Sequence, residues 1–174
     1  MNAPTAVLQR ATAADAPLLE NLLELYIHDL SEIVPVEPGP DGRFGYPRLA
    51  LYWTEPDRRH AFLIRSGVGL AGFALVTRGS PASDDPEALD VAEFFVLRRH
   101  RRTGIAREAA FALWDLFPGQ WIVRVFEANR AGLPFWSRAV REYTGGAFAE
   151  RSQSEPYGQR RVFGFASRAR RESA

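Results

Sequence analysis

The stretch that decides the fold is Arg101-Arg102-Thr103-Gly104-Ile105-Ala106, a basic loop that contains one glycine. It follows the apolar run VAEFFVL at 91–97, whose composition is typical of a β-strand. After the loop, apolar residues recur at helical spacing as far as Pro118-Gly119, which would end a helix. The sequence therefore predicts a strand, a tight basic loop and a helix in direct succession.

Gly104 stands where this loop would enter the helix, a place that suits a bound phosphate group. The first N–H groups of a helix are unpaired and lie at the positive end of its dipole. Small residues at Gly104 and Ala106 would let a pyrophosphate come close to the backbone. A P-loop is excluded because the chain contains no lysine, and a Rossmann fingerprint because two of its three glycines are missing. An exposed, arginine-rich loop that ends in a glycine explains the hexapeptide equally well.

The pattern Arg-x-x-Gly-x-Ala, made by Arg101, Gly104 and Ala106, resembles the acetyl-CoA signature of the GNAT superfamily of N-acetyltransferases. The run AEFFVLRRHRRTGIAREAAFALWDLFPGQW, with FW and EYTGG further on, is similar to a group of small bacterial GNAT proteins. This resemblance supports a fold and an activity, but it does not identify a substrate.

A second part of the resemblance lies downstream of the loop. The expected strand at 121–126 is followed by Asn129 and then by a helical stretch that carries Phe135-Trp136. GNAT proteins have a similar strand, asparagine and aromatic helix in the same order. Taken singly, Asn129 could be a helix N-cap and Trp136 a core residue. Together and in this order, they favour the family.

The resemblance implies a mixed α/β fold: a mostly antiparallel, twisted sheet of about seven strands with flanking helices. Its fourth and fifth strands would part and hold acetyl-CoA between them as a co-substrate. The order of elements expected along the chain agrees: a strand at 7–10, a helix, three strands, a helix, a strand, a helix and two strands. The hairpin is expected at 61–65 and 70–77, and the last two strands at 147–151 and 161–165.

The same resemblance assigns residues to the co-substrate. The pantetheine arm would lie along the backbone at 95–97, the pyrophosphate would bind the amides at 102–106, and Asn129 would contact the arm. The aromatic pair would lie beside the thiol end. The candidate cofactor-binding residues are Phe95, Val96, Leu97, Arg101, Arg102, Thr103, Gly104, Ile105, Ala106, Asn129, Phe135 and Trp136.

Glu93 is the candidate catalytic base because it stands in the otherwise apolar centre of the expected strand at 91–97. Burial would raise its pKa, as a base needs. It could equally face outward and pair with an arginine, and in many relatives the acidic residue lies three positions earlier, where this chain has Asp90. A general acid is not assigned, because Trp136 occupies the usual tyrosine position. Tyr143, Tyr157 or water could return the proton to the thiolate.

The expected activity is transfer of an acetyl group from acetyl-CoA to a primary amine of a small molecule or peptide, by direct attack in a ternary complex. The alternative is a non-catalytic acyl-CoA-binding module that senses the cofactor or supports a partner. Contacts to the amine would come from aromatic and acidic residues between the first helix and the hairpin. These residues are Tyr26, His28, Asp29, Glu32, Phe44, Tyr46, Tyr52 and Trp53.

Composition limits the remaining classes. The 174 residues are expected to form one domain at 1–166 with a polar, arginine-rich tail at 167–174. A net charge of +1 gives no reason to expect nucleic acid or an anionic membrane as a partner, and a phosphate-rich cofactor accounts for the arginines at 98–102. Without cysteine, and with three scattered histidines, no metal site is expected. No membrane span or signal peptide is recognised, so we expect a cytoplasmic protein and leave a homodimer open.

Overall fold

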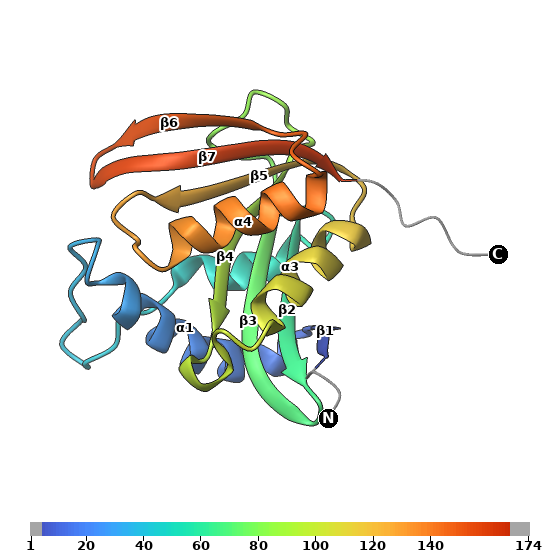
Figure 1. The fold of residues 1–174 in the computed structure, drawn as a ribbon. Helices are drawn as coiled ribbons and strands as arrows, with labels where there is room; N and C mark the ends of the chain where they lie inside the picture. Colours follow the sequence, from blue (N-terminus) through green and yellow to red (C-terminus); the bar gives the residue numbers. More distant parts are fainter. Residues whose placement is uncertain (1–4, 168–174) are drawn as a thin grey trace.

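One mixed sheet runs through the molecule, and the computed structural model describes it over residues 5–167 (Figure 1). The strand order is β1-β2-β3-β4-β5-β7-β6. All neighbours are antiparallel except β4 and β5, which are parallel. The strands are β1 Ala6–Arg10, β2 Arg59–Ser66, β3 Gly69–Arg78, β4 Leu89–Val96, β5 Gly119–Phe126, β6 Ala149–Glu155 and β7 Gly158–Ser167.

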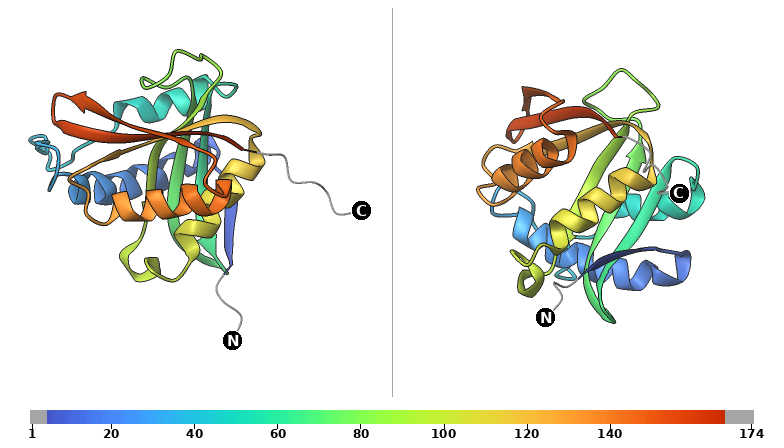
Figure 2. Two further views of the ribbon diagram at one scale, coloured as in Figure 1. Left: turned by 45° about the horizontal axis from the view of Figure 1, so that its top comes forward. Right: turned by 45° about the vertical axis from the view of Figure 1, so that its right-hand side comes forward.

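Helices cover both faces of this sheet (Figure 2). One layer holds α3 and α4, whose buried residues share a core cluster with β4, β5 and β7. The other holds α1 and α2, which pack on β2 and β3. The helical segments are η1 Ala13–Asp15, α1 Ala16–Leu30, η2 Pro47–Ala50, α2 Leu51–Thr54, η3 Arg98–His100, α3 Ile105–Leu116 and α4 Gly132–Thr144.

The central strands read as continuous apolar runs because both of their faces are covered. In β2, Leu63 and Ile64 are adjacent, point to opposite faces and are both fully buried. In β3, Ala74 and Leu75 behave in the same way. The long apolar stripes predicted for the flanking helices therefore find a surface on each side of the sheet.

The parallel strands β4 and β5 part from each other after a short paired stretch. Pairing runs only from Leu89 opposite Trp121 to Val91 opposite Val123. Beyond this point β4 continues to Val96 and β5 to Phe126, but the two strands no longer pair with each other. A bulge bends β4 at the same place, because Leu75 and Val76 of β3 pair with Glu93 and Val91 and leave one residue over. The expected sheet with parted fourth and fifth strands is confirmed.

Most expected strand boundaries differ from the structure by one to four residues, and two of these differences change the path of the chain. Strand β4 ends at Val96, so Leu97 lies outside it and caps η3. Strand β6 begins at Ala149 rather than at 147, because Gly145 and Gly146 adopt positive φ values of 62° and 91° and carry the chain away from α4 first.

The end of the chain differs as well. Ser167, which was expected to begin the tail, ends β7 and is buried, with its hydroxyl donating to the Phe117 carbonyl at 3.0 Å. The rest of the expected tail, 168–174, lies outside the described residues.

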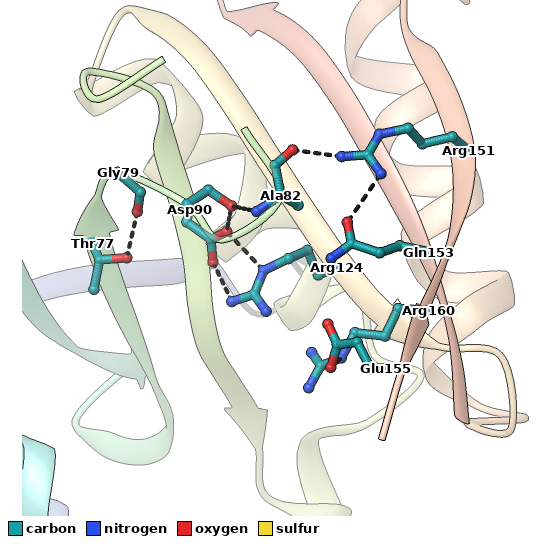
Figure 3. Close-up of polar contacts among 10 residues, drawn as sticks. Thr77, Gly79, Ala82, Asp90, Arg124, Arg151, Gln153, Glu155 and Arg160 are labelled. Atoms are coloured by element: carbon teal, nitrogen blue, oxygen red, sulfur yellow. Dashed lines mark hydrogen bonds and ion pairs between the residues drawn. The ribbon is translucent and has the colours of Figure 1, made fainter. Parts of the chain in front are cut away.

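A buried ion pair joins β4 to β5 where the two strands begin to part (Figure 3). Arg124 Nε and Nη2 donate to the two carboxylate oxygens of Asp90 at 2.8 and 2.9 Å. The Ser80 hydroxyl donates to the same carboxylate. Asp90 is fully buried, and the Arg124 side chain is 13% exposed. Two parallel N–H···O bonds fix the relative position of the strands more firmly than a single contact would.

Replacing Arg124 by methionine should lower the free energy of unfolding by about 3–5 kcal/mol, because Asp90 would stay buried without its partner. Urea denaturation monitored by tryptophan fluorescence measures the change. The control is Arg107→Ala, which removes an ion pair to Glu142 whose side chains are 48% and 43% exposed. This control should cost less than about 1 kcal/mol. Equal costs for the two variants would contradict the role given to the buried pair.

Candidate functional site

Glu93 lies on β4 beside the bulge and is held by two tyrosines from separate parts of the chain. The Tyr26 hydroxyl, on α1, donates to Glu93 Oε2 at 2.6 Å. The Tyr46 hydroxyl, on the loop before η2, donates to Oε1 at 3.0 Å. The carboxyl group therefore faces the layer that contains α1, and it pairs with no arginine among residues 5–167.

A pocket of about 320 Å³ opens above this carboxylate. Helix α1 contributes Tyr26, Ile27 and Leu30, and the following loop contributes Val36, Glu37 and the segment Phe44-Gly45-Tyr46. Most of the lining is aromatic or aliphatic, and the described residues that line it include no basic side chain. The pocket places an ionisable oxygen at the base of a mainly apolar cavity.

The loop that forms one wall of the pocket is attached to α1 through a single carboxylate. Glu24 accepts hydrogen bonds from the backbone N–H groups of Phe44 and Gly45, each at 2.8 Å. Gly45 has a φ of 69°, a conformation that costs glycine little, and this bend lets both amides face the same side chain. Arg43 lies 3.7 Å from Glu24 and 3.6 Å from Glu20 and adds charge pairing outside the wall.

Burial raises the pKa of Glu93, while the hydrogen bonds from Tyr26 and Tyr46 and the charges of Arg124 and Arg160 lower it in part. Burial is the larger effect, and the pKa lies above the ordinary value of 4.5. The pKa of Tyr46 is also raised, first by burial and then by the charge of Glu93. Both tyrosine hydroxyls therefore remain neutral donors, and Glu93 has an increased affinity for a proton.

Two arginines whose charges act on Glu93, one on β5 and one on β7, already have carboxylate partners (Figure 3). Arg124 holds Asp90, as described above. Arg160 Nε lies 2.7 Å from Glu155 Oε2, and its guanidinium lies 3.9 Å from the ring centre of Phe126. Neither arginine is left as an uncompensated positive charge.

The loop before α3 has the backbone of an anion-binding turn. Arg102 and Gly104 have φ values of 63° and 95°, and Gly104 is the N-cap of α3 without any side-chain cap. A Cβ placed on Gly104 would meet no atom within 4 Å, so the space in front of the helix is open. Successive amides in a turn of alternating hand form a concave surface that favours anions. Ile105 is buried against Ala109, which anchors the helix start.

The side chains of this loop divide into two groups. Arg101 is held by the protein: its Nε donates to the Val96 carbonyl at 2.8 Å and its Nη2 to Asp29 at 2.7 Å. The Thr103 hydroxyl is turned back to the His100 carbonyl at 2.7 Å. Arg102 is exposed and makes no hydrogen bond or ion pair with any residue from 5 to 167. Of the two arginines proposed for phosphate, Arg102 has the available charge.

The other candidate residues lie around the opening between β4 and β5. Asn129 Oδ1 accepts from the Gly132 amide at 2.7 Å, so in this structure its side chain stabilises the start of α4. Phe135 stacks on Phe94 at 6.3 Å, and Trp136 is buried at 5.0 Å from the same ring.

The strand residues Phe95 and Val96 are both buried, on different sides of the sheet. The Phe95 ring packs beside Tyr26, with its centre 6.0 Å away. Leu97 follows the end of the strand and packs against the α1 layer, while Ala106 lies on the α3 side.

The alternative acid and base candidates do not reach the pocket. Asp90 is bound by Arg124 and Ser80, as described above. The Tyr143 hydroxyl donates to Asp115 at 2.7 Å between α3 and α4, and Tyr157 is exposed at the turn between β6 and β7. Among the described residues, no group of three or more metal-ligating side chains occurs. The helices within 5–167 also include none that could span a membrane.

Tyr26 and Tyr46 were expected among the contacts to the amine, but their hydrogen bonds to Glu93 were not. The Tyr26 ring also packs on Phe73, with the ring centres 5.8 Å apart. Glu24, a partly buried residue of α1, was not singled out. No periodicity marks such positions, because the tertiary fold alone brings them to β4.

Comparison with solved structures identifies the architecture. The chain is similar to an acetyltransferase from Thermus thermophilus, with 19% identity, a TM-score of 0.67, and 95% and 99% of the two chains covered. It is similar to a spermidine N-acetyltransferase from Vibrio cholerae in complex with CoA and spermine, with 13% identity, a TM-score of 0.62, and 94% and 96% covered. It is also similar to a nucleotide-linked sugar GNAT, with 14% identity, a TM-score of 0.63, and 95% and 89% of the two chains covered. No family model and no curated protein matches the sequence.

The parted parallel strands, with a glycine-capped helix after the first of them, define an α/β architecture that these acetyltransferase structures share. More particularly, the chain has the GNAT fold. At these identities the likeness concerns the fold alone.

Substituting Glu93 by glutamine should make the protein relatively more stable as the pH rises. A carboxyl whose folded pKa is raised stabilises the fold fully below its unfolded pKa, near 4.5, and this contribution is lost as the pH rises through the folded pKa. Glutamine does not titrate, so the stability of the variant minus that of wild type should grow as the pH rises above about 4.5 and through the folded pKa of Glu93. Urea unfolding at several pH values measures it. Parallel curves for the two proteins would contradict the buried, protonatable state of Glu93.

Proposed function

We propose that this protein is an acetyl-CoA-dependent N-acetyltransferase that acts in the cytoplasm and acetylates a primary amine by direct attack in a ternary complex. The observation that carries the proposal is Glu93: a carboxyl with a raised pKa, at the base of a pocket, on the strand that parts from its parallel neighbour. A base is useful because a simple amine, with a pKa of about 10.4, is largely protonated at neutral pH.

The residues around the opening fit acetyl-CoA. The uncapped amides at the start of α3 and the exposed Arg102 suit its pyrophosphate, and the open space at Gly104 gives access to them. Beyond Val91, the edge of β4 that faces β5 has no strand partner and can bind the amide groups of pantetheine. We therefore retain the twelve cofactor-binding residues as a proposal, with Arg101 acting through the position of the loop rather than by direct contact.

The chemistry then follows from the two sides of β4. The ammonium first gives one proton to the Glu93 carboxylate, which passes it to solvent. The neutral amine nitrogen then attacks the acetyl carbon, and the second proton that this nitrogen loses passes to Glu93. The bond from carbon to sulfur breaks, and the thiolate of coenzyme A takes a proton from water. Since a thiol has a pKa of about 8.5, the leaving group needs little help from the protein. Glu93 finally returns its proton to solvent. The unpaired N–H groups of β4 would stabilise the oxyanion.

The second candidate is a non-catalytic module that binds acyl-CoA, and Trp136 favours it. Trp136 is buried among Phe94, Phe135 and Trp114 and cannot supply a proton. Thermal shift with acetyl-CoA tests binding and would support both candidates. Release of free thiol in the presence of a panel of amines supports only the enzyme.

Gly104→Glu should abolish acetyl-CoA binding while the protein remains folded, because a side chain and a negative charge would enter the proposed phosphate site. Isothermal titration calorimetry with acetyl-CoA measures the affinity. Gly146→Glu is the matched control, since its φ of 91° is close to the 95° of Gly104 and a Cβ there also meets nothing within 4 Å. The control should bind normally. Unchanged affinity in Gly104→Glu would remove the phosphate site from the proposal.

Glu93→Gln should lower the turnover number about a hundredfold at neutral pH, as expected for loss of a general base, and leave the acetyl-CoA affinity unchanged. Activity should recover in part at alkaline pH, where solution deprotonates the amine. The control is Glu37→Gln, which changes an exposed carboxylate at the rim of the same pocket. A Glu93→Gln variant with normal turnover at neutral pH would exclude Glu93 as the base.

A further inference from the structure

We infer that the acceptor is a compact primary amine with an apolar body and no carboxylate or phosphate next to the amine. This inference rests on the proposed function, because it names the class of molecule that the pocket above Glu93 takes.

The walls of the pocket supply apolar contact along its length. Ile27 and Leu30 on α1 face Val36 and Phe44 on the loop, and Glu93 forms the base. An amine placed at the carboxylate would direct the rest of its body between these side chains. Burying apolar surface there is favourable by about 25 cal/mol per Å².

The charges of the pocket favour a cationic head group over an anionic one. Glu93 and Glu37 are its charged lining residues, and none of the described lining side chains is basic. Glu37 is exposed at the rim, where solvent weakens its attraction, so the buried carboxylate is the main determinant. A substrate carboxylate near the amine would meet Glu93 without a compensating positive charge.

The two arginines whose charges act on Glu93 do not alter this balance. Arg124 and Arg160 face Glu93 from the other side of the opening, but their guanidiniums are held by Asp90 and Glu155. A substrate carboxylate would have to displace one of these carboxylates and leave it unpaired. The structure is therefore arranged against amino acids as acceptors.

The size and attachment of the pocket favour a small acceptor. Its volume of about 320 Å³ lies at the lower end of the range of ligand sites, roughly 300–1,000 Å³. The wall formed by the loop is fixed to Glu24 by two backbone hydrogen bonds, so the pocket is formed before a ligand arrives. A folded protein segment would need a wider and more open surface.

The experiment compares 2-phenylethylamine with L-phenylalanine, which has the same ring and amine and adds only a carboxylate, and with 1,5-diaminopentane, which adds a second cation. Free thiol release gives kcat/KM for each, and calorimetry on the protein saturated with coenzyme A gives the affinity for each amine. Val36→Arg places a cation in the apolar wall. Val68→Arg is the matched control, on the fully exposed turn between β2 and β3.

We expect 2-phenylethylamine to be preferred over L-phenylalanine by about tenfold or more, and this preference to be lost in Val36→Arg but kept in Val68→Arg. Preference for L-phenylalanine would overturn the inference, because it would mean that a basic side chain binds the substrate carboxylate. Preference for 1,5-diaminopentane that falls in Glu37→Gln would also overturn it. Acetylation of a peptide amine, with none of the three small amines acetylated, would overturn the inference as well.

The binding measurement separates this inference from the proposed function. If 2-phenylethylamine binds in a manner sensitive to Val36→Arg but no amine is acetylated, the pocket assignment stands and the enzymatic function fails. If other amines are acetylated but 2-phenylethylamine neither binds nor reacts, the proposed enzymatic function stands and the acceptor class inferred for the pocket fails.

Discussion

The geometry of the molecule depends on the buried pair between Asp90 and Arg124. Two strands that run parallel and then part need a fixed point at the place of divergence, because beyond it no backbone hydrogen bonds hold them to each other. The bidentate pair provides this point with both charges compensated. The unpaired edge of β4 and the carboxyl group of Glu93 are both positioned relative to it.

The bulge in β4 gives one strand two functions. Residues before it pair with β5 and belong to the core, whereas Glu93 after it turns toward α1 and meets Tyr26 and Tyr46. Two neutral hydroxyls stabilise the carboxylate without neutralising it, as an arginine would. Burial then sets its proton affinity above that of an exposed glutamate. A base at neutral pH requires this combination of a desolvated carboxyl and uncharged partners.

Much of the fold could be predicted from the sequence, because apolar periodicity and turn residues are local properties. The strand at 91–97, the glycine at the start of α3 and the order of elements were recognisable in this way. Glu93 was found because a charged residue in an apolar strand is conspicuous. Tyr26 and Tyr46 were recognised as candidate contacts to the amine, but their bonds to Glu93 were not, because these bonds span 67 and 47 positions of the chain. The role of Arg101 was likewise hidden, because its bond to Asp29 spans 72 positions of the chain.

The attachment of the loop to Glu24 has a consequence for how such a protein diverges. The loop is held by the main-chain N–H groups of Phe44 and Gly45, and a main-chain donor is present whatever side chain the residue carries, proline excepted. Side chains on the loop can therefore be exchanged in the course of evolution while the anchor persists. The lining of the pocket can change by point mutations in this one segment, without disturbing β4 and β5.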